Sequence, residues 1–202
     1  MKKICQRCIL DADFPAISFD SQGVCNYCHS YEKNDAKYNL TDPNKKSFLK
    51  IIDKIKDAGK NHEYDSIIGV SGGRDSSYCL YLLKKWGLNP LAVHYDNNMD
   101  SKIAAENIKN ACSRLDIDLQ TFVVNWDEFK DLQRAFLFAS VPSVDIPTDH
   151  AFVTTLYREA HEKGIKYIFN GASFRTEGPI PPEWSLHGDE KFILDIHKKF
   201  GT

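Results

Sequence analysis

Apolar and polar positions alternate along most of the chain in a way that predicts strands and helices in turn. From residue 65 onward, short apolar runs typical of buried strands are separated by segments whose apolar residues recur at helical spacing. The pattern predicts strands over 65–70, 89–96, 118–125 and 165–171, and helices over 75–87, 101–116, 127–139 and 149–164. Strands and helices that alternate at this spacing form a parallel sheet with right-handed crossovers. We therefore expect an α/β fold with a parallel, doubly wound, Rossmann-like sheet.

The two ends of the chain depart from this pattern. Before the first strand, "TDPNKKSFLKIIDKIKDAG" (41–59) predicts a helix with Asp42 as its cap. The first 30 residues show little helical periodicity, and the residues after 171 predict a proline-rich loop and one short helix. The expected organisation is a small module over 1–38, a linking helix over 39–62 and an α/β domain over 63–202.

Four of the six cysteines lie near the N-terminus as two Cys-x2-Cys pairs. The spacing between the pairs is typical of structural zinc sites, in which each pair supplies two thiolates to a tetrahedron. Ligation by four thiolates also serves iron–sulfur clusters, which stay the competing interpretation. The predicted metal ligands are Cys5, Cys8, Cys25 and Cys28. His29 is interpreted as a bystander, and Cys79 and Cys112 as residues of the helical core.

The segment "SGGRDSS" (71–77) follows the first predicted strand and begins a helix. Glycines let the backbone approach an anion, and free N–H groups at a helix N-terminus point toward it. The loop matches neither the Walker A pattern nor GxGxxG, and no lysine follows its glycines. Asp75 would repel a phosphate unless a divalent cation lies between them, so Mg²⁺ is expected here. The alternative is a tight strand–helix turn capped by Asp75 or a serine.

Composition narrows the class of partner. The chain has 202 residues, of which 42% are hydrophobic and 27% charged, as is ordinary for a soluble globular protein. Its 26 basic and 28 acidic residues give a net charge of −2, so no global attraction to nucleic acid or to an anionic membrane is expected. The N-terminus lacks the apolar core of a signal peptide, and a cytoplasmic location is predicted.

The loop carries a resemblance to a known superfamily. "SGGRDSS" after "DSIIGV" resembles the PP-loop of the N-type ATP pyrophosphatases, whose adenine nucleotide α-hydrolase-like domains bind the pyrophosphate that leaves ATP. Together with "CQRCILDADFPAISFDSQGVCNYC", "LAVHYDNNMDS" and "NGASFRTEG", it is similar to the N-acetyl sugar amidotransferases of surface-polysaccharide (lipopolysaccharide O-antigen) biosynthesis. Members of that family are longer, which leaves the completeness of the α/β domain open.

The resemblance implies a reaction. The acetamido oxygen of a nucleotide-linked N-acetyl sugar would attack the α-phosphate of ATP, which gives an O-adenylated imidate and pyrophosphate. Ammonia would then displace AMP and leave an acetamidino group. The chain shows no glutaminase signature, so a separate glutaminase subunit is the implied ammonia source. The implied cofactors are ATP, Mg²⁺ and Zn²⁺, and a homo-oligomer is left open.

The resemblance and the rule that ligands bind at the carboxyl ends of parallel strands also imply site residues. The catalytic candidates are Asp75, Ser76 and Arg74. The residues expected to bind ATP and Mg²⁺ are Ser71, Gly72, Gly73, Asp75, Ser76, Ser77, Tyr95, Asp96 and Gly171, with His94 and Asn170 beside them. Arg175, Glu177 and His150 are expected near the substrate, although His150 and Asp149 are also explained as a helix cap and its neighbour.

Two other functions compete with this one. A PP-loop tRNA thiolase also combines Cys-x2-Cys pairs with such a loop, but it needs reactive cysteines, and a basic surface is not evident in this sequence. A non-catalytic ATP-binding fragment is the second alternative.

Overall fold

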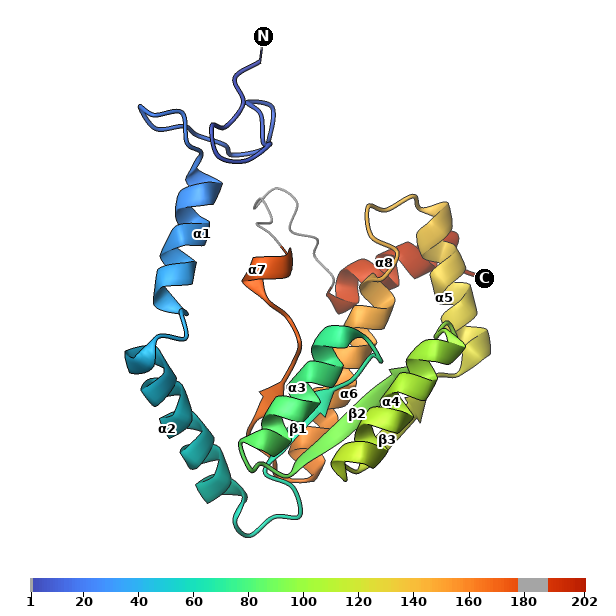
Figure 1. Ribbon diagram of the computed structural model, residues 1–202. Helices are drawn as coiled ribbons and strands as arrows, with labels where there is room; N and C mark the ends of the chain where they lie inside the picture. Colours follow the sequence, from blue (N-terminus) through green and yellow to red (C-terminus); the bar gives the residue numbers. More distant parts are fainter. Residues whose placement is uncertain (1, 178–188) are drawn as a thin grey trace. The chain divides into compact units, whose positions relative to one another are not determined.

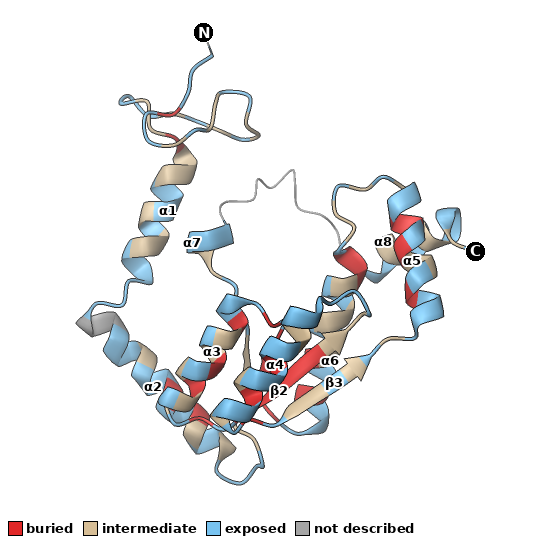
Figure 2. Cartoon of the chain, turned by 45° about the vertical axis from the view of Figure 1, so that its right-hand side comes forward, coloured by how far each residue is buried: buried red, intermediate tan, exposed pale blue. Residues whose placement is uncertain are grey.

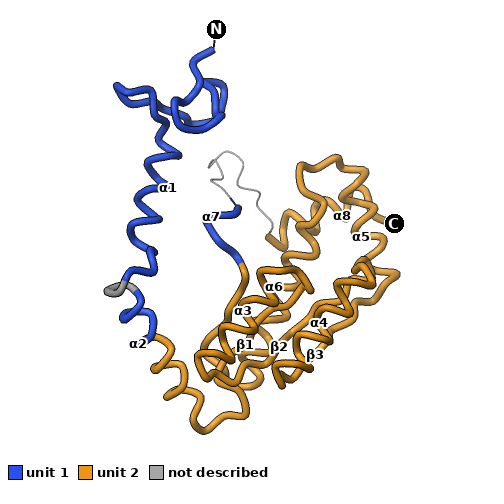
Figure 3. The backbone as a smooth tube through the Cα atoms, in the orientation of Figure 1, with its two compact units in different colours: residues 1–50, 172–186 blue, residues 51–171, 187–202 orange. Residues whose placement is uncertain are grey.

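The structure is a computed structural model that describes residues 2–177 and 189–202 (Figure 1). Residues of the predicted proline-rich loop from 178 to 188 lie outside the described residues. The chain divides into two units (Figure 3). Unit 1 comprises residues 1–50 and 172–186, and unit 2 comprises residues 51–171 and 187–202.

Unit 2 is built on a parallel sheet of four strands in the order β3-β2-β1-β4. The strands are β1 (Ser66–Gly69), β2 (Pro90–Asp96), β3 (Leu119–Val123) and β4 (Ile168–Phe169). The register pairs Ile67 of β1 with Leu91 of β2 and with Ile168 of β4. The α/β fold class and the parallel sheet expected from the hydrophobic pattern are confirmed. β4 is shorter than its apolar run predicts, because only two of its residues pair with β1.

Helices cover both faces of the sheet, as a doubly wound fold requires (Figure 2). The helices α3 (Arg74–Lys85) and α4 (Lys102–Leu115) pack against each other on one face. The helix α6 (Ile146–Glu162) packs against β1, β2 and β4 from the other. One buried cluster lies between the sheet and α6 and contains Ile67, Leu91, Val93, Leu156, Ala160 and Ile165. Burial of these side chains stabilises the fold, at about 25 cal/mol per Å² of apolar surface.

The helix α6 begins earlier than its sequence pattern predicts. We expected a start at residue 149, with Asp149 as cap, whereas the helix begins at Ile146 after Asp145. Pro147 fits the first turn because that position needs no N–H donor. Asp149 therefore lies inside the first turn, where its N–H donates to the Asp145 carbonyl at 2.9 Å. The cap interpretation of Asp149 is wrong.

Unit 1 contains a helix that the sequence pattern missed. The helix α1 (Asn26–Lys37) begins inside the second Cys-x2-Cys pair, and none of its residues is buried. Without a buried face it carries no apolar periodicity, and its cap is the sulfur of Cys25 rather than a serine or aspartate. The helix α2 (Asp42–Gly59) follows, and the short helix α7 (Phe174–Glu177) packs on α1. The ring of Phe174 lies 5.7 Å from that of Tyr31.

The last helix of unit 2 docks on α5 (Trp126–Phe138). This helix, α8 (Glu190–Phe200), matches the short helix expected in the tail. Its contact includes the Asp131 carboxylate, which accepts hydrogen bonds from the Thr202 hydroxyl at 2.7 Å and from the Thr202 N–H. The Nε2 atom of His197 lies 2.8 Å from the same carboxylate. These bonds, above all the one from the Thr202 hydroxyl, lower the pKa of Asp131 to about 2.

This low pKa predicts a pH dependence of stability. In an unfolded chain Asp131 titrates near its ordinary value of about 3.9. Because the folded pKa is depressed, the contribution of Asp131 is fully present above that value and is lost as the pH falls through about 2. The difference in free energy of unfolding between the wild type and Asp131→Asn should be constant above about pH 5 and shrink toward pH 2. Urea titrations at a series of pH values measure it.

The exposed Asp195 on α8 supplies the matched control. The difference in free energy of unfolding between the wild type and Asp195→Asn should not shrink between pH 5 and pH 2. A difference for Asp131→Asn that stays constant from pH 5 to pH 2 would contradict the prediction.

Among the described helices, none combines the length and the apolar character that crossing a bilayer requires.

Candidate functional site

The glycine loop joins the end of β1 to the start of α3. Gly72 has a φ of +71°, in the left-handed region, and its backbone packs against α4. A Cβ built there would lie 2.3 Å from the Ala104 carbonyl oxygen, which no side chain can accept. The side-chain amide of Asn107 donates to the Gly72 carbonyl at 3.2 Å. The first glycine is therefore required by a backbone–backbone approach, and α4 holds the loop in place.

The helix that follows begins without a side-chain cap. Its N-cap is Gly73, and within the described part of the chain no side chain caps the helix there. The interpretation of this turn as one capped by Asp75 or a serine is thus wrong. The hydroxyl groups of Ser76 and Ser77 instead donate to the Gly73 carbonyl, at 3.2 and 2.8 Å. Uncapped N–H groups and the helix dipole suit this end of α3 to an anion.

The charged residues of the loop lie at the surface. The side chain of Arg74 is 89% exposed and that of Asp75 is 59% exposed, and the Nε atom of Arg74 lies 3.6 Å from a carboxylate oxygen of Asp75. A salt bridge this exposed contributes little to stability. Both side chains are therefore free to turn toward a ligand, and Asp75 offers the carboxylate oxygen that Mg²⁺ prefers.

The end of β4 closes one side of the loop. A Cβ on Gly171 would lie 3.1 Å from the Ser76 nitrogen, tighter than most real contacts. The Asn170 carbonyl accepts from the Cys79 thiol, with 3.7 Å between sulfur and oxygen. The structure thus brings the predicted residues Asn170 and Gly171 against the start of α3, although they follow the loop by about a hundred residues.

A cavity of about 220 Å³ lies at the carboxyl ends of β1 and β2. Its described lining consists of Val70, Ser71, His94, Tyr95, Asn97, Asp100, Thr148, Asp149 and Phe152. Burial raises the pKa of Asp149, and the neighbouring Asp145 adds to the shift. Burial also raises the pKa of Tyr95. Because Ser71 belongs to both the loop and the cavity lining, the two features are continuous.

Several of these lining residues were missed by the sequence reasoning. Asn97 and Asp100 follow β2 in the polar run "DNNMDS", and that run was the available signal. Thr148 and Phe152 come from α6, which no local pattern connects to β2. The amide of Asn97 donates to the Thr148 hydroxyl at 3.2 Å and ties the two elements together.

The remaining predicted residues lie elsewhere. Asp96 accepts a hydrogen bond from the Asn98 N–H at 2.8 Å and is not part of the cavity lining. His150 is exposed on α6 and does not line the cavity either. Arg175 belongs to unit 1, where its Nε atom donates to Asp35 at 3.0 Å, and the Glu177 carboxylate of that unit accepts from the Ser173 N–H at 3.0 Å. The substrate roles of His150, Arg175 and Glu177 stay predictions.

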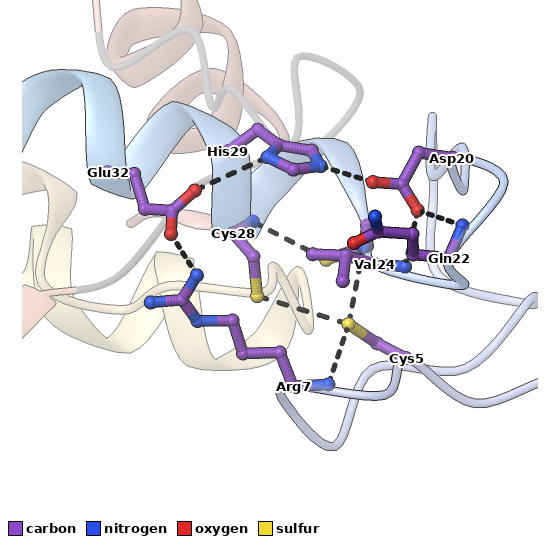
Figure 4. Close-up of polar contacts among 9 residues, drawn as sticks. Cys5, Arg7, Asp20, Gln22, Val24, Cys28, His29 and Glu32 are labelled. Carbon is purple, nitrogen blue, oxygen red and sulfur yellow. Dashed lines mark hydrogen bonds and ion pairs between the residues drawn. The ribbon is translucent and has the colours of Figure 1, made fainter.

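The four cysteines of unit 1 converge on one point, and Figure 4 shows two of them, Cys5 and Cys28, with their sulfurs facing each other. The sulfurs of Cys5 and Cys28 lie 3.9 Å apart, and those of Cys8 and Cys25 lie 3.7 Å apart. Two thiolates on a single tetrahedral zinc ion, each about 2.3 Å from it, lie about 3.8 Å from each other. The spacing of the sulfurs fits one tetrahedral ion.

The protonation of these thiols also favours a metal. Burial acts to raise the pKa of Cys5, but N–H donors from Arg7, Cys8 and Cys25 outweigh it and lower that pKa to about 6. Burial raises the pKa of Cys28, and the adjacent sulfurs raise it further. Because four adjacent thiols, two of them buried, cannot all ionise side by side without a cation, the arrangement suits a metal centre.

Charged side chains brace this centre (Figure 4). Arg7 forms an ion pair with Glu32, and the Nδ1 atom of His29 lies 3.3 Å from the Glu32 carboxylate. The Nε2 atom of His29 lies 2.8 Å from Asp20, which also accepts from the Val24 N–H at 2.9 Å. This network ties the loop before Cys25 to α1. Both ring nitrogens of His29 face carboxylates rather than the cysteine sulfurs. This agrees with the interpretation that His29 is not a ligand of the metal.

The two other cysteines have no metal-binding partners among the described residues. Cys112 is buried, and burial raises its pKa. Burial also raises the pKa of Cys79, with a smaller contribution from Asp75. Reactive cysteines have lowered pKa values, so the direction of both shifts disfavours a nucleophilic role for either thiol.

The fold and the site together define an α/β domain with a glycine loop and an uncapped helix N-terminus at the carboxyl edge of a parallel sheet, in a chain that also has a four-cysteine unit. No protein-family model matches the chain. An uncharacterized protein from Methanocaldococcus jannaschii is 29% identical over 156 residues, which cover 77% of this chain and 53% of that protein. The 7-cyano-7-deazaguanine synthase of Clostridium novyi is 29% identical over 119 residues, 54% of each chain. The chain thus matches about half the length of these relatives.

Solved structures with a similar arrangement include two synthetases. The NH3-dependent NAD synthetase from Campylobacter jejuni aligns with 18% identity and a TM-score of 0.44, over 74% of this chain and 70% of that one. The NMN synthetase from Francisella tularensis aligns with 18% identity and a TM-score of 0.47, over 77% and 70% of the two chains.

Proposed function

We propose that the chain forms an ATP-dependent enzyme of the PP-loop class. The observation that carries this proposal is the loop geometry. The buried strand β1 leads into a loop in which Gly72 has a positive φ, and α3 begins without a side-chain cap. These features offer backbone N–H donors to the pyrophosphate portion of ATP without a lysine. The similarity to a synthase over 119 residues agrees with an enzymatic role.

Within that class, we propose the amidotransferase reaction. The acetamido oxygen of a nucleotide-linked N-acetyl sugar attacks the α-phosphate of ATP and releases pyrophosphate. Ammonia from a partner glutaminase then replaces AMP and leaves an acetamidino group. The support is the set of motifs that resembles the N-acetyl sugar amidotransferases, above all the cysteine pairs combined with the loop.

The chain's own residues have defined tasks in this scheme. A neutral amide oxygen is a weak nucleophile, so the site acts mainly by orienting the reactants and by stabilising the leaving pyrophosphate. The uncapped N–H groups of α3 bind pyrophosphate oxygens, and the hydroxyls of Ser76 and Ser77 can rotate from the Gly73 carbonyl to join them. Mg²⁺ held by Asp75 would neutralise charge on the leaving group. The adenosine would occupy the cavity beside Tyr95.

The cysteine centre is proposed to hold Zn²⁺ as a structural ion. All four candidate ligands are cysteines, and the 3.7 and 3.9 Å sulfur separations fit a closed tetrahedron. A closed site leaves no position for a reactive water, so the ion stabilises unit 1 rather than taking part in the reaction.

The tRNA thiolase is the less favoured candidate. A sulfur carrier needs an accessible thiol of lowered pKa, whereas burial raises the pKa of both Cys79 and Cys112.

Pyrophosphate exchange tests the function. The chain is incubated with ATP, labelled pyrophosphate and a panel of nucleotide-linked N-acetyl sugars, and AMP release is then scored with ammonium present. Sugar-dependent exchange is expected, and Asp75→Asn should lower it by about 100-fold because charge on the leaving group is no longer neutralised. The exposed Asp53 on α2 provides the control Asp53→Asn, which should leave exchange unchanged. AMP release triggered only by unmodified tRNA would favour the thiolase, and ATP binding without exchange would favour the non-catalytic fragment.

A further inference from the structure

A second group of potential metal ligands lies at the carboxyl end of β2, apart from the cysteine centre. His94, Asp96 and Asp100 each offer one ligand atom, and these atoms all lie within 4.8 Å of one another. His94 and Asp96 are on β2 itself, and Asp100 is in the turn that follows it. No step of the proposed reaction uses these three side chains together.

The orientation of His94 is the main evidence. Its side chain is buried, and its Nδ1 atom lies 3.1 Å from the Val70 carbonyl oxygen. A carbonyl oxygen only accepts hydrogen bonds, so Nδ1 carries the proton, and in a neutral imidazole the Nε2 atom then presents a lone pair. That lone pair faces a carboxylate oxygen of Asp100 at 2.9 Å. A second proton on Nε2 or a bound metal cation can join these two atoms, and the third donor, Asp96, within 4.8 Å of both, favours the metal cation.

The distances match a metal ion in this role. Two ligand atoms that each lie about 2.1 Å from an ion, at right angles to each other, are about 3.0 Å apart. Metal-bound histidines usually donate their other ring N–H to a carbonyl or carboxylate, as His94 does to Val70. The Asp96 carboxylate is oriented by the Asn98 N–H at 2.8 Å and keeps a second oxygen for the ion.

The site has an open side. His94 and Asp100 also line the cavity of about 220 Å³, and so do Ser71 and Asp149. An ion bound here would therefore keep coordination positions for water or for an oxygen of a ligand in the cavity. The carboxylates of Asp96, Asp100 and Asp149 make these surroundings negative, which favours a cation.

We propose that His94, Asp96 and Asp100 bind a first-row divalent transition ion whose open positions face this cavity. An imidazole nitrogen favours Zn²⁺ or Mn²⁺ over Mg²⁺ and Ca²⁺, and the two carboxylates suit Mn²⁺. The ion is distinct from the cysteine-bound ion, whose thiolate ligands select zinc. It is also distinct from Mg²⁺ at Asp75, and its binding requires neither ATP nor the amidotransferase reaction.

Manganese binding to the full chain tests the proposal. The zinc-loaded protein, without nucleotide, is titrated with Mn²⁺, and free Mn²⁺ is followed by electron paramagnetic resonance. One Mn²⁺ per chain is expected in the wild type. Asp100→Asn and His94→Gln should each weaken its affinity at least about tenfold, because each removes a direct ligand. Asp53→Asn is the matched control and should bind as the wild type does.

Two further variants keep the outcome clear. Because His94 is buried, circular dichroism is used to check that the His94→Gln variant is folded. If that variant does not fold, the test depends on Asp100→Asn, whose side chain is more accessible. Asp75→Asn should retain Mn²⁺ binding in the absence of nucleotide. The proposal would be overturned if the wild-type protein did not bind Mn²⁺. It would also be overturned if Asp100→Asn bound Mn²⁺ as the wild type does while Asp75→Asn lost the binding. Neither result would bear on pyrophosphate exchange, so the proposed function stands or fails separately.

Discussion

Replacing Gly72 by alanine is expected to lower the free energy of unfolding by about 2 to 5 kcal/mol. The left-handed backbone costs a residue with a Cβ about 1 to 2 kcal/mol, and overpacking against backbone costs about 1 to 3 more. The clash here is severe, because the added Cβ would lie 2.3 Å from the Ala104 carbonyl oxygen and 2.8 Å from the Ala104 Cα. Urea denaturation measures the loss. Sugar-dependent pyrophosphate exchange should fall as well, since the loop or α4 must shift.

The next glycine gives the matched control. Gly73 has a φ of −75°, which any residue adopts, and a Cβ there would meet the Ser71 hydroxyl oxygen at an ordinary 3.4 Å. Gly73→Ala should therefore change the free energy of unfolding by no more than about 0.5 kcal/mol. Equal destabilisation by the two substitutions would show that the close approach to α4 does not set the requirement for glycine.

Replacing Cys25 by serine should remove the proposed zinc ion and unfold the cysteine module. Cys25 is fully buried, and its sulfur has two tasks, as a candidate ligand and as the cap of α1. Structural zinc contributes on the order of 10 kcal/mol to the folding of small modules, far more than the few buried side chains of this segment can replace. Zinc per chain, measured after gel filtration, should fall well below one. Residues 1–38 should become sensitive to protease.

A cysteine outside the centre provides the comparison. Cys79→Ser should retain one zinc per chain, because the Cys79 sulfur lies on α3 and is not part of the cluster. If Cys25→Ser kept its zinc and its resistance to protease, the four-cysteine assignment would be wrong. Iron in place of zinc in the wild-type protein would instead support the iron–sulfur interpretation.

Much of unit 2 was predictable because its evidence is local. A strand buried on both faces is continuously apolar, and a helix on a sheet has one apolar face. Ile108 and Cys112 of α4 are buried as the spacing predicts. The start of a helix was harder to predict where its first residues are unusual. The helix α6 has Pro147 in its first turn, and α1 is capped by the sulfur of Cys25. The helix α1 was missed because a helix without a buried face carries no hydrophobic period.

The sequence by itself determined the α/β class, the four converging cysteines and the loop at the end of β1. Each of these is encoded in residues that are neighbours or lie at short, regular spacings. The tertiary structure alone decided which side chains share a site. Ala104 makes Gly72 necessary, Gly171 closes on Ser76, and Asp149 of α6 joins Tyr95 at the cavity. Such contacts join residues that are up to about a hundred positions apart. They depend on how helices pack on the sheet, and a pattern of hydrophobic and polar positions specifies which face is buried but not which partner it meets.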